Sequence, residues 1–176
     1  MLNIKSLEER AKKIRLLCTD VDGVLTTGTL YYHSSTTHSK SFDAKDGVGI
    51  KLLQRADIQV AFISGLYSLS TINRAADLQI TDCVVGESDK KKIIEQLCKK
   101  YKLVSNEVAY VGDDLMDLSA IKSVGLACCP QDAVAEIRTA SHWVVPVPGG
   151  RGVIRAIAEM ILKTQGRWET ALSSFV

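Results

Sequence analysis

The sequence lacks the features that would place it in a specialised class of protein. No apolar run is longer than a few residues, whereas a transmembrane helix needs about 20. Basic and acidic residues nearly balance, 22 against 20, so no bulk charge favours nucleic acid or an anionic membrane as a partner. Residues 1–13 are charged and lack the apolar core of a signal peptide. These absences predict a cytoplasmic protein, with one domain over residues 1–176.

The cysteines lack the spacing of a metal or disulfide motif. They are five in number, and no two of them form a C-x-x-C pair. Because most lie among apolar residues, we expect reduced, buried thiols. The adjacent Cys128 and Cys129 have no histidine near them in the sequence, so a structural role is favoured over metal binding.

What the sequence does contain is a regular alternation of short apolar runs and helical patterns. This order predicts an α/β fold with a doubly wound, mainly parallel, Rossmann-like sheet and right-handed crossovers. The expected strands are 14–18, 58–63, 83–85, 108–111, 125–128 and 142–145, and the expected helices are about 6–13, 46–55, 68–78, 88–101, 115–123, 132–139 and 153–162.

Two segments fall outside this alternation. In residues 29–42, β-branched and aromatic residues flank a Ser/Thr-rich turn, which predicts a β-hairpin. His33 and His38 lie at or beside its tip, and we expect exposed turn residues there, not metal ligands. The tail, residues 164–176, is too apolar for a fraying end, so we expect it to dock on this subunit or a neighbouring one; its large apolar residues are Trp168, Leu172 and Phe175.

Chemically active residues collect where the expected strands end. The first strand stops at Asp20 and Asp22, and the second stops at Ser64-Gly65. The fourth stops at Asp113-Asp114, and Lys90 opens the helix that follows the third. In an open α/β sheet these positions share the edge where ligands bind. A single site containing all of them is therefore predicted.

The chemistry of this set favours phosphoryl transfer. Two carboxylates in close contact repel each other by about 4 kcal/mol at an effective dielectric near 20, and an all-oxygen site relieves this by binding Mg²⁺. A lysine and a Ser-Gly turn with free N–H groups suit a phosphoryl group. One carboxylate can attack phosphorus, while another protonates the departing oxygen and then activates water.

The same residues resemble the four motifs of the haloacid dehalogenase superfamily of phosphohydrolases. The motifs are Asp20-Val21-Asp22-Gly23, Ser64-Gly65, Lys90 and Gly112-Asp113-Asp114-x-x-Asp117. A closer resemblance, from about residue 14 to 162, is to a branch that has no cap domain and hydrolyses 3-deoxy-D-manno-octulosonate 8-phosphate in lipopolysaccharide precursor synthesis. It is carried by the segments Val21–Thr26, Phe42–Ile50, Ala109–Leu115 and Gly149–Gly152.

This resemblance implies a role for each acidic residue of the motifs. Asp20 would be the nucleophile and a metal ligand. Asp22 would be the general acid and base, and its main-chain carbonyl would also bind Mg²⁺. Asp113 would be the third protein ligand, with Asp114 and Asp117 in support.

The resemblance also implies how the substrate is held. Ser64 and Gly65 would hold the transferring phosphoryl group, and Lys90 would neutralise charge on it and on Asp20. The residues that would line the substrate site are Asp22, Asp43, Ala44, Lys45, Asp46, Gly47, Lys51, Gly65, Arg74 and Lys90. The resembling enzymes are homotetramers.

Several of these residues have a simpler interpretation. Lys90 heads a run of three lysines that is typical of a solvated helix face, and Arg74 fits an exposed helix position. Asp43 could cap a helix, and Arg151 could either pin a turn or bind an acidic substrate.

The chain departs from the pattern of the branch in three places, which bear on the substrate. Thr27 replaces an aspartate before Gly28, Leu66 replaces an arginine after Ser64-Gly65, and Lys45 replaces another arginine. The Leu66 change removes a charge-assisted contact to the acid end of the substrate. A different phosphorylated nonulosonate or sugar acid is therefore the second hypothesis.

Two further classes of function are considered. A non-catalytic assembly domain of the same fold is disfavoured because the acids and the lysine of the motifs are retained. A phosphoacceptor receiver domain would need an aspartate after the third strand, where Val85-Gly86 stands.

The spacing of the motifs leaves no room for a lid. Only the hairpin stretch separates Gly23 from Asp46, and only a helix and a strand lie between Ser64 and Lys90. An open phosphoryl site would admit bulk water. We therefore expect neighbouring subunits to close the site, with the hairpin and the tail as candidate contacts.

Overall fold

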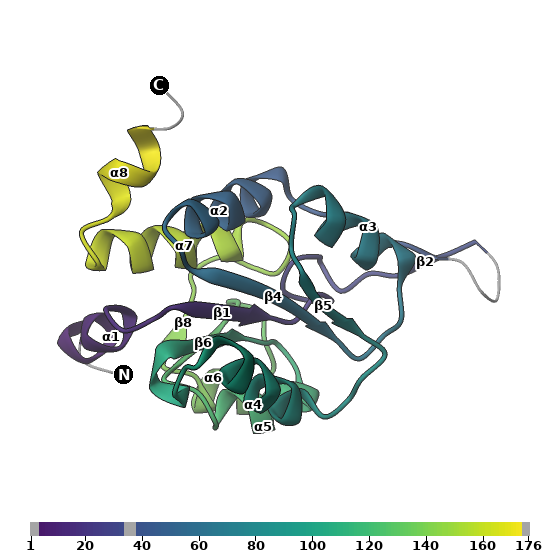
Figure 1. Cartoon of the computed structure of the whole chain (residues 1–176). Helices are drawn as coiled ribbons and strands as arrows, with labels where there is room; N and C mark the ends of the chain where they lie inside the picture. Colours follow the sequence, from purple (N-terminus) through teal and green to yellow (C-terminus); the bar gives the residue numbers. More distant parts are fainter. Residues whose placement is uncertain (1–3, 34–37, 174–176) are drawn as a thin grey trace.

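A single parallel sheet forms the centre of the fold. The computed structural model describes residues 4–33 and 38–173. Among these, the sheet has the strand order β5-β4-β1-β6-β7-β8, and every neighbouring pair is parallel (Figure 1). Its strands are β1 (Leu16–Thr19), β4 (Gln59–Ser64), β5 (Asp82–Val85), β6 (Val108–Val111), β7 (Leu126–Cys129) and β8 (Trp143–Val144). The predicted α/β fold is confirmed.

The order of the strands places a switch point at β1. The chain runs from β1 outward through β4 to β5, and then crosses back to add β6, β7 and β8 on the other side. Ligands of open α/β sheets bind beyond the carboxyl ends of the strands at such a point. Asp20 directly follows β1, so it lies there.

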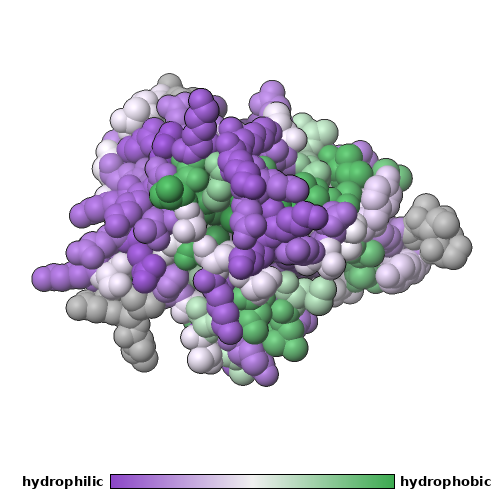
Figure 2. All heavy atoms as spheres, turned by 60° about the horizontal axis from the view of Figure 1, so that its bottom comes forward, coloured by the Kyte–Doolittle hydropathy of each residue, from purple (hydrophilic) through white to green (hydrophobic). Residues whose placement is uncertain are grey.

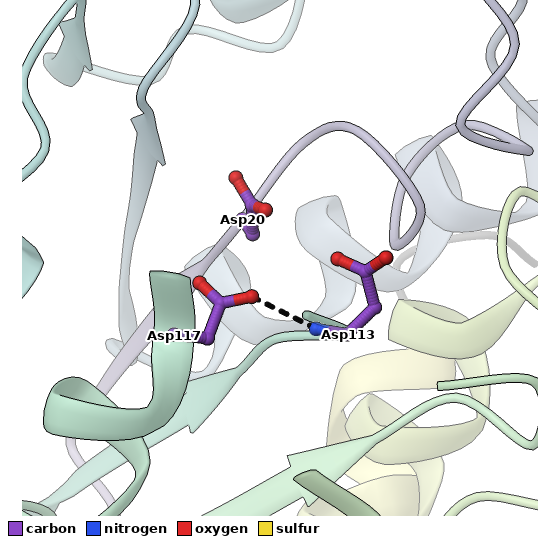
Figure 3. A group of neighbouring side chains, drawn as sticks. All are labelled: Asp20, Asp113 and Asp117. Carbon is purple, nitrogen blue, oxygen red and sulfur yellow. Dashed lines mark hydrogen bonds between the residues drawn. The ribbon is translucent and has the colours of Figure 1, made fainter. Parts of the chain in front are cut away.

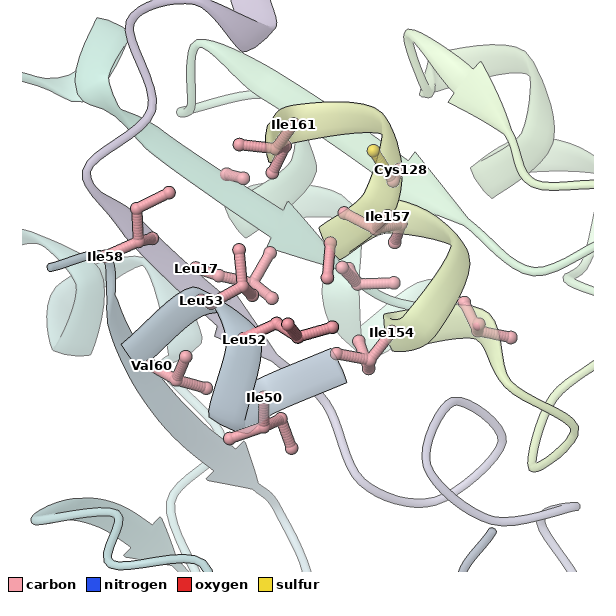
Figure 4. Packing of buried hydrophobic residues seen from close by; sticks show 14 of the residues in the cluster. Leu17, Ile50, Leu52, Leu53, Ile58, Val60, Cys128, Ile154, Ile157 and Ile161 are labelled. Carbon is pink, nitrogen blue, oxygen red and sulfur yellow. The ribbon is translucent and has the colours of Figure 1, made fainter. Parts of the chain in front are cut away.

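Helices cover both faces of the sheet (Figure 1). In β1, Leu17 packs into one apolar cluster with helices α2 and α7, whereas Leu16 and Cys18 pack into the other with α4, α5 and α6 (Figures 1 and 4). The helices are α1 (Ile4–Ala11), α2 (Ala44–Arg55), α3 (Leu69–Asp77), α4 (Lys90–Tyr101), α5 (Leu118–Ile121), α6 (Ala135–Ala140), α7 (Val153–Thr164) and α8 (Trp168–Leu172). The strands thus have two buried faces, as their continuous apolar runs predict.

The cysteines are free thiols, and Cys18, Cys128 and Cys129 are buried as predicted, whereas Cys83 and Cys98 are only half-buried. Cys128 and Cys129 are both buried but belong to the two different clusters, because successive strand residues point to opposite faces. Their side chains therefore fill the core and do not converge on a metal.

Local interactions shift several element boundaries. Helix α2 begins two residues earlier than expected, because the Asp43 side chain accepts a hydrogen bond from the Lys45 N–H and caps it. The expected helix 115–123 is a 3₁₀ turn, Leu115–Asp117, followed by the short α5. Its first residues are drawn into a turn because the Asp117 N–H donates to the Asp114 carbonyl.

The hairpin is present but short. Strands β2 (Tyr31–Tyr32) and β3 (His38–Ser39) pair antiparallel, and the expected tip, residues 34–37, lies outside the described residues. His33 is exposed as predicted, whereas the same expectation for His38 is wrong, because its ring packs 5.7 Å from that of Tyr32 and is half-buried.

The tail packs on its own chain as far as the structure describes it. Helix α8 places Trp168 under the cations of Arg155 and Lys163, at 5.7 and 4.9 Å from the ring centroid, and buries Ala171. Leu172 also packs against the cluster of α2 and α7, and Phe175 lies outside the described residues. Figure 1 shows α8 at the end of the molecule opposite the carboxyl ends of the strands.

None of the helices in the described ranges combines the length and the apolar character that crossing a bilayer requires.

The packing of α2 on the sheet gives a stability prediction. Leu53 is fully buried in the cluster of Figure 4, so Leu53→Ala should lower the free energy of unfolding by about 2–5 kcal/mol. Val104→Ala, at a residue that is 63% exposed, should change it by less than about 0.5 kcal/mol. Urea denaturation measures both, and similar losses in the two variants would contradict the assignment of Leu53 to the core.

Candidate active site

The first part of the site is the loop that follows β1. The Asp20 N–H donates to the Val111 carbonyl at 2.9 Å, which extends the β1–β6 pairing by one residue. The chain then turns tightly, with the N–H groups of Leu25 and Thr26 both donating to the Val21 carbonyl. Asp20 is thereby fixed at the end of the central strand, and its residue surface is only 8% exposed.

Gly23 allows the second acidic loop to approach the first. Its φ is +83°, and a Cβ there would lie 2.0 Å from Oδ2 of Asp113. The loop after β6 therefore reaches the loop after β1 only because position 23 has no side chain.

The Gly149–Gly152 segment supports the same loop from the other side. The Gly150 N–H donates to the Val24 carbonyl at 2.9 Å, and a Cβ on Gly149 would lie 2.0 Å from the Gly23 carbonyl oxygen. Arg151 itself is exposed. The segment that sequence analysis could not assign thus holds the Asp20–Asp22 loop in place through its glycines.

Lys90 lies between two of the acids and is not part of a solvated face. Its Nζ is 3.0 Å from Oδ1 of Asp20 and 2.6 Å from Oδ1 of Asp117, and the residue is 2% exposed. Its neighbours Lys91 and Lys92 are exposed. Burial opposes the charge of Lys90, but the carboxylates of Asp20 and Asp117 outweigh it and raise the pKa of the ammonium.

Asp117 organises the second acidic loop. Its Oδ1 accepts from Lys90 and from the Tyr110 hydroxyl. Its Oδ2 accepts from the N–H groups of Asp113 and Asp114, and Figure 3 shows the bond to Asp113. With both oxygens engaged by donors of the chain, Asp117 positions Asp113 and is not free to bind a ligand. Tyr110 was not predicted as a residue of the site. The one indication in the sequence is that a tyrosine in a buried strand needs a hydrogen-bond partner for its hydroxyl.

The acids of the site carry more negative charge than Lys90 can balance. Oxygens of Asp20, Asp113 and Asp117 lie within 4.8 Å of one another (Figure 3). Burial, and then the Asp117 charge, raise the pKa of Asp20 to about 7 despite Lys90. Burial and the charges of Asp20, Asp117 and Asp114 raise the pKa of Asp113 to about 8.

This donor set fits a hard divalent cation. No described residue donates a hydrogen bond to the Asp113 side chain, and the nearby Asp20 carboxylate has only Lys90 as a side-chain partner. Oxygen donors with excess negative charge are the environment that Mg²⁺ prefers. Asp20 and Asp113 are the side chains that could hold it, and the part of the Asp22 main-chain carbonyl stays a prediction.

A pocket of about 300 Å³ opens above these acids. Ser64 is buried, and its Oγ accepts from the Leu66 N–H at 3.3 Å, which closes the turn after β4. Gly65 is exposed, with no atom within 4 Å of where a Cβ would stand. The pocket is lined by Asp20, Asp22, Gly28, Ser64, Gly65, Leu66, Lys90, Asp113, Asp114, Met116 and Asp117. The predicted catalytic, phosphoryl-binding and metal residues thus converge on one pocket.

A residue that sequence analysis missed contacts Asp22. Lys40, just after β3, places Nζ 2.7 Å from Oδ2 of Asp22, and its side chain is 0% exposed. In the sequence this lysine stands among polar residues of the second half of the hairpin, where nothing distinguishes it from an exposed lysine.

Some of the residues predicted to bind substrate form a cluster outside the pocket lining. Arg74 donates to the Asp43 carbonyl at 3.4 Å, stands 5.8 Å from the Phe42 ring centroid and covers Gly47. Lys45 is exposed and pairs with Asp43 at 3.6 Å, and Ala44 begins α2. These residues are not among those that line the 300 Å³ pocket, so their role in substrate binding stays a prediction.

Asp46 and Lys51 are engaged in holding helices together. Buried Asp46 accepts from the Arg155 N–H at 3.0 Å at the start of α7, and burial raises its pKa to about 6. The Lys51 Nζ donates to the Leu78 carbonyl at 2.7 Å and to Gln79 at 2.8 Å. Neither side chain lines the 300 Å³ pocket, so the role of both residues in substrate binding stays a prediction.

Comparisons with known proteins agree with this geometry. Residues 61–157 match the haloacid dehalogenase-like hydrolase family. The 3-deoxy-D-manno-octulosonate 8-phosphate phosphatase of Haemophilus influenzae is 38% identical over 92% of this chain and 89% of its own. The crystal structure of the Yersinia pestis phosphatase of the same name is 36% identical, with a TM-score of 0.91 over 93% of this chain and 89% of that one.

A third relative was solved with bound groups. The Moraxella catarrhalis phosphatase of the same name, in complex with a magnesium ion, a phosphate ion and the sugar acid, is 32% identical. It superposes with a TM-score of 0.94 over 99% of this chain and 100% of that one.

The crowded acids predict opposite effects of pH and Mg²⁺ on stability. Because Asp20 and Asp113 titrate near 7 and 8 when folded but near 3.8 when unfolded, unfolding releases protons between these values. The metal-free protein should therefore lose stability as pH rises from about 5 to 8. Mg²⁺ at a concentration 100 times its Kd at pH 8 should add about 2.7 kcal/mol to the free energy of unfolding at that pH. The same concentration should add less at pH 5, where protons compete for the carboxylates, and thermal unfolding measures both effects.

Two variants test the source of this effect. Asp113→Asn should lose most of the Mg²⁺ stabilisation and show a weaker pH dependence. Asp57→Asn, at a side chain that is 96% exposed, should behave like the wild type. An unchanged Mg²⁺ effect in Asp113→Asn would show that the cation binds elsewhere.

Proposed function

The chain belongs to the haloacid dehalogenase-like hydrolases, in the family of the 3-deoxy-D-manno-octulosonate 8-phosphate phosphatases, and we propose that it hydrolyses this sugar-acid phosphate in lipopolysaccharide precursor synthesis. The observation that carries the proposal is the Asp20 carboxylate at the end of the central strand, 3.0 Å from a buried lysine. It lines the same pocket as Asp113 and the Ser64-Gly65 turn. This is the arrangement that a phosphoryl group and a carboxylate nucleophile require.

In the proposed reaction Asp20 is the nucleophile. A carboxylate oxygen of Asp20 attacks phosphorus, and an aspartyl phosphate forms as the bond from phosphorus to the sugar oxygen breaks. The departing oxygen takes a proton from Asp22. Asp22 then takes a proton from a water molecule as that water attacks the aspartyl phosphate, which releases phosphate and restores Asp20.

Other residues hold the phosphoryl group while this happens. The Ser64 hydroxyl and the Gly65 N–H donate to its oxygens, and Lys90 neutralises charge on it and on Asp20. Asp20, Asp113 and the Asp22 carbonyl would hold Mg²⁺, which would supply further neutralisation of the phosphoryl charge. Asp114 and Asp117 support the metal-binding loop.

The acid end of the substrate is where a different specificity could arise. Leu66 lines the pocket where the resembling enzymes carry an arginine, and Thr27 is exposed near Gly28. Lys45 lies within the predicted substrate segment, and Arg74 contacts that segment at the Asp43 carbonyl. Another phosphorylated nonulosonate or sugar acid remains the second candidate substrate, and a cytoplasmic location stays a prediction.

Phosphate release with Mg²⁺ tests the proposed reaction. The expected result is turnover of 3-deoxy-D-manno-octulosonate 8-phosphate with a higher kcat/KM than for other sugar-acid phosphates. Asp20→Asn should lower kcat at least about 10⁴-fold because the nucleophile is lost, whereas Asp57→Asn should retain activity. Full activity of Asp20→Asn would exclude the covalent route, and a higher kcat/KM for a nonulosonate phosphate would favour the second substrate.

We also propose that four chains assemble and that neighbouring subunits close the pocket. Figure 2 shows apolar surface at the end of the molecule that carries the hairpin, within a face that is otherwise largely polar. Large apolar side chains that are more than half exposed include several near the pocket or on the hairpin: Tyr31, Tyr32, Tyr67, Leu69, Leu115 and Met116. Exposed apolar side chains gathered in this way are typical of an interface.

Light scattering after size exclusion tests the assembly. The wild type should have four times the 19.2 kDa chain mass. Tyr32→Lys on the hairpin should lower that mass and reduce turnover, because it introduces charge at a 65% exposed tyrosine of the proposed interface. Val104→Lys, at a 63% exposed residue far from the hairpin, should change neither. A monomeric wild type with full activity would contradict the proposal.

A further inference from the structure

Lys40 is a buried cation that the reaction described above does not use. Its side chain is 0% exposed, although the residue belongs to the return leg of a surface hairpin. Nζ donates to Oδ2 of Asp22 at 2.7 Å and to Oγ1 of the buried Thr71 at 3.2 Å. A buried ammonium group needs such partners, so its position is determined by Asp22 and α3 together.

The contact leaves the two oxygens of Asp22 in different environments. Oδ2 is held by Lys40, whereas Oδ1 is buried and has no hydrogen-bond partner among the described residues. Asp22 also lines the pocket that contains Asp20. Oδ1 is therefore the oxygen that is free to exchange a proton with a group bound there.

The second strand of the hairpin, β3, is hydrogen-bonded to α3, the helix that follows the phosphoryl-binding turn. The Ser70 hydroxyl donates to the His38 carbonyl at 3.3 Å, and the neighbouring Thr71 accepts from Lys40. Both residues lie in the first turns of α3, just after Ser64-Gly65. Lys40 thus links the hairpin, α3 and the Asp22 side chain.

We propose that Lys40 is a positioning residue for proton transfer, which holds Asp22 by Oδ2 so that Oδ1 faces the departing oxygen of the substrate. This inference rests on the proposed phosphatase function. In the step concerned, Asp20 forms its bond to phosphorus, the bond to the leaving oxygen breaks, and that oxygen receives the proton from Oδ1 of Asp22. Without Lys40 the carboxyl group can rotate away, and the leaving oxygen departs without a well-placed proton donor.

A pair of similarly shaped substrates distinguishes this role from a structural one. Phenyl phosphate needs a proton on its departing oxygen much more than p-nitrophenyl phosphate does, and kcat/KM reports the steps up to that departure. In Lys40→Met, kcat/KM for phenyl phosphate should fall about 10- to 100-fold, while p-nitrophenyl phosphate is affected about tenfold less. Lys100→Met removes an exposed lysine from a comparable 2.6 Å ion pair with Asp82 and should leave both values unchanged.

The double variant identifies Asp22 as the group through which Lys40 acts. Asp22→Asn alone should raise the ratio of p-nitrophenyl to phenyl phosphate kcat/KM, and adding Lys40→Met should raise it no further. Thermal unfolding verifies that each variant is folded, and Lys40→Gln, which keeps a polar group but removes the charge, takes the place of Lys40→Met where that variant does not fold.

The outcomes separate this inference from the proposed function. The positioning role alone is overturned if the wild type is active and loss of Lys40 leaves the ratio of the two kcat/KM values unchanged, including the case in which both values fall equally. A further rise of the ratio in the double variant also overturns it, because Lys40 would then act through another group. A folded wild type without Mg²⁺-dependent phosphatase activity overturns both.

Discussion

Mutual repulsion among carboxylates at the end of β1 is the constraint on which the rest of the site depends. Oxygens of Asp20, Asp113 and Asp117 meet within 4.8 Å, and burial raises the pKa of Asp20 and of Asp113. The chain compensates in part: Lys90 is buried between two of them, and backbone N–H groups engage Asp117. The charge that is left is what draws a divalent cation and, with it, a phosphoryl group.

Close backbone packing is what brings the acids together. The loops after β1 and β6 meet at Gly23, and the Gly149–Gly150 pair lies directly against the same loop. These contacts lie at the switch point of the sheet, where β1 leads to α2 on one face and β6 leads to α5 on the other, which leaves space for a ligand. The parallel sheet therefore determines where the site lies. The glycines allow the backbone segments to come close, although the carboxylates that they carry repel one another.

The sequence allowed the fold and the reacting groups to be predicted because both depend on local patterns. Apolar runs that end in acids identify strands and their carboxyl ends, and Asp20 and Asp113 follow directly. Lys40 and the helix-binding role of Asp46 escaped prediction, because each is defined by a partner in another segment of the chain. Tyr110 escaped it because its partner, Asp117, lies in the turn beyond its own strand. Hydrogen bonds between distant segments leave no periodicity in the sequence. The start of α2 was also displaced, since a single cap at Asp43 decides it.

Reaction chemistry and substrate selection are carried by different parts of the structure. The acids, Lys90 and Ser64 are held by buried contacts to the sheet, so they tolerate little displacement. Several residues expected to select the substrate, Asp43, Ala44, Lys45 and Arg74, lie at the start of α2 and on α3, outside the pocket lining, and are partly or fully exposed. Leu66 and Met116 also line the pocket, but neither is one of the groups that the phosphoryl chemistry uses. A change such as the leucine at position 66 can therefore alter which sugar acid is accepted without removing a group of the phosphoryl chemistry.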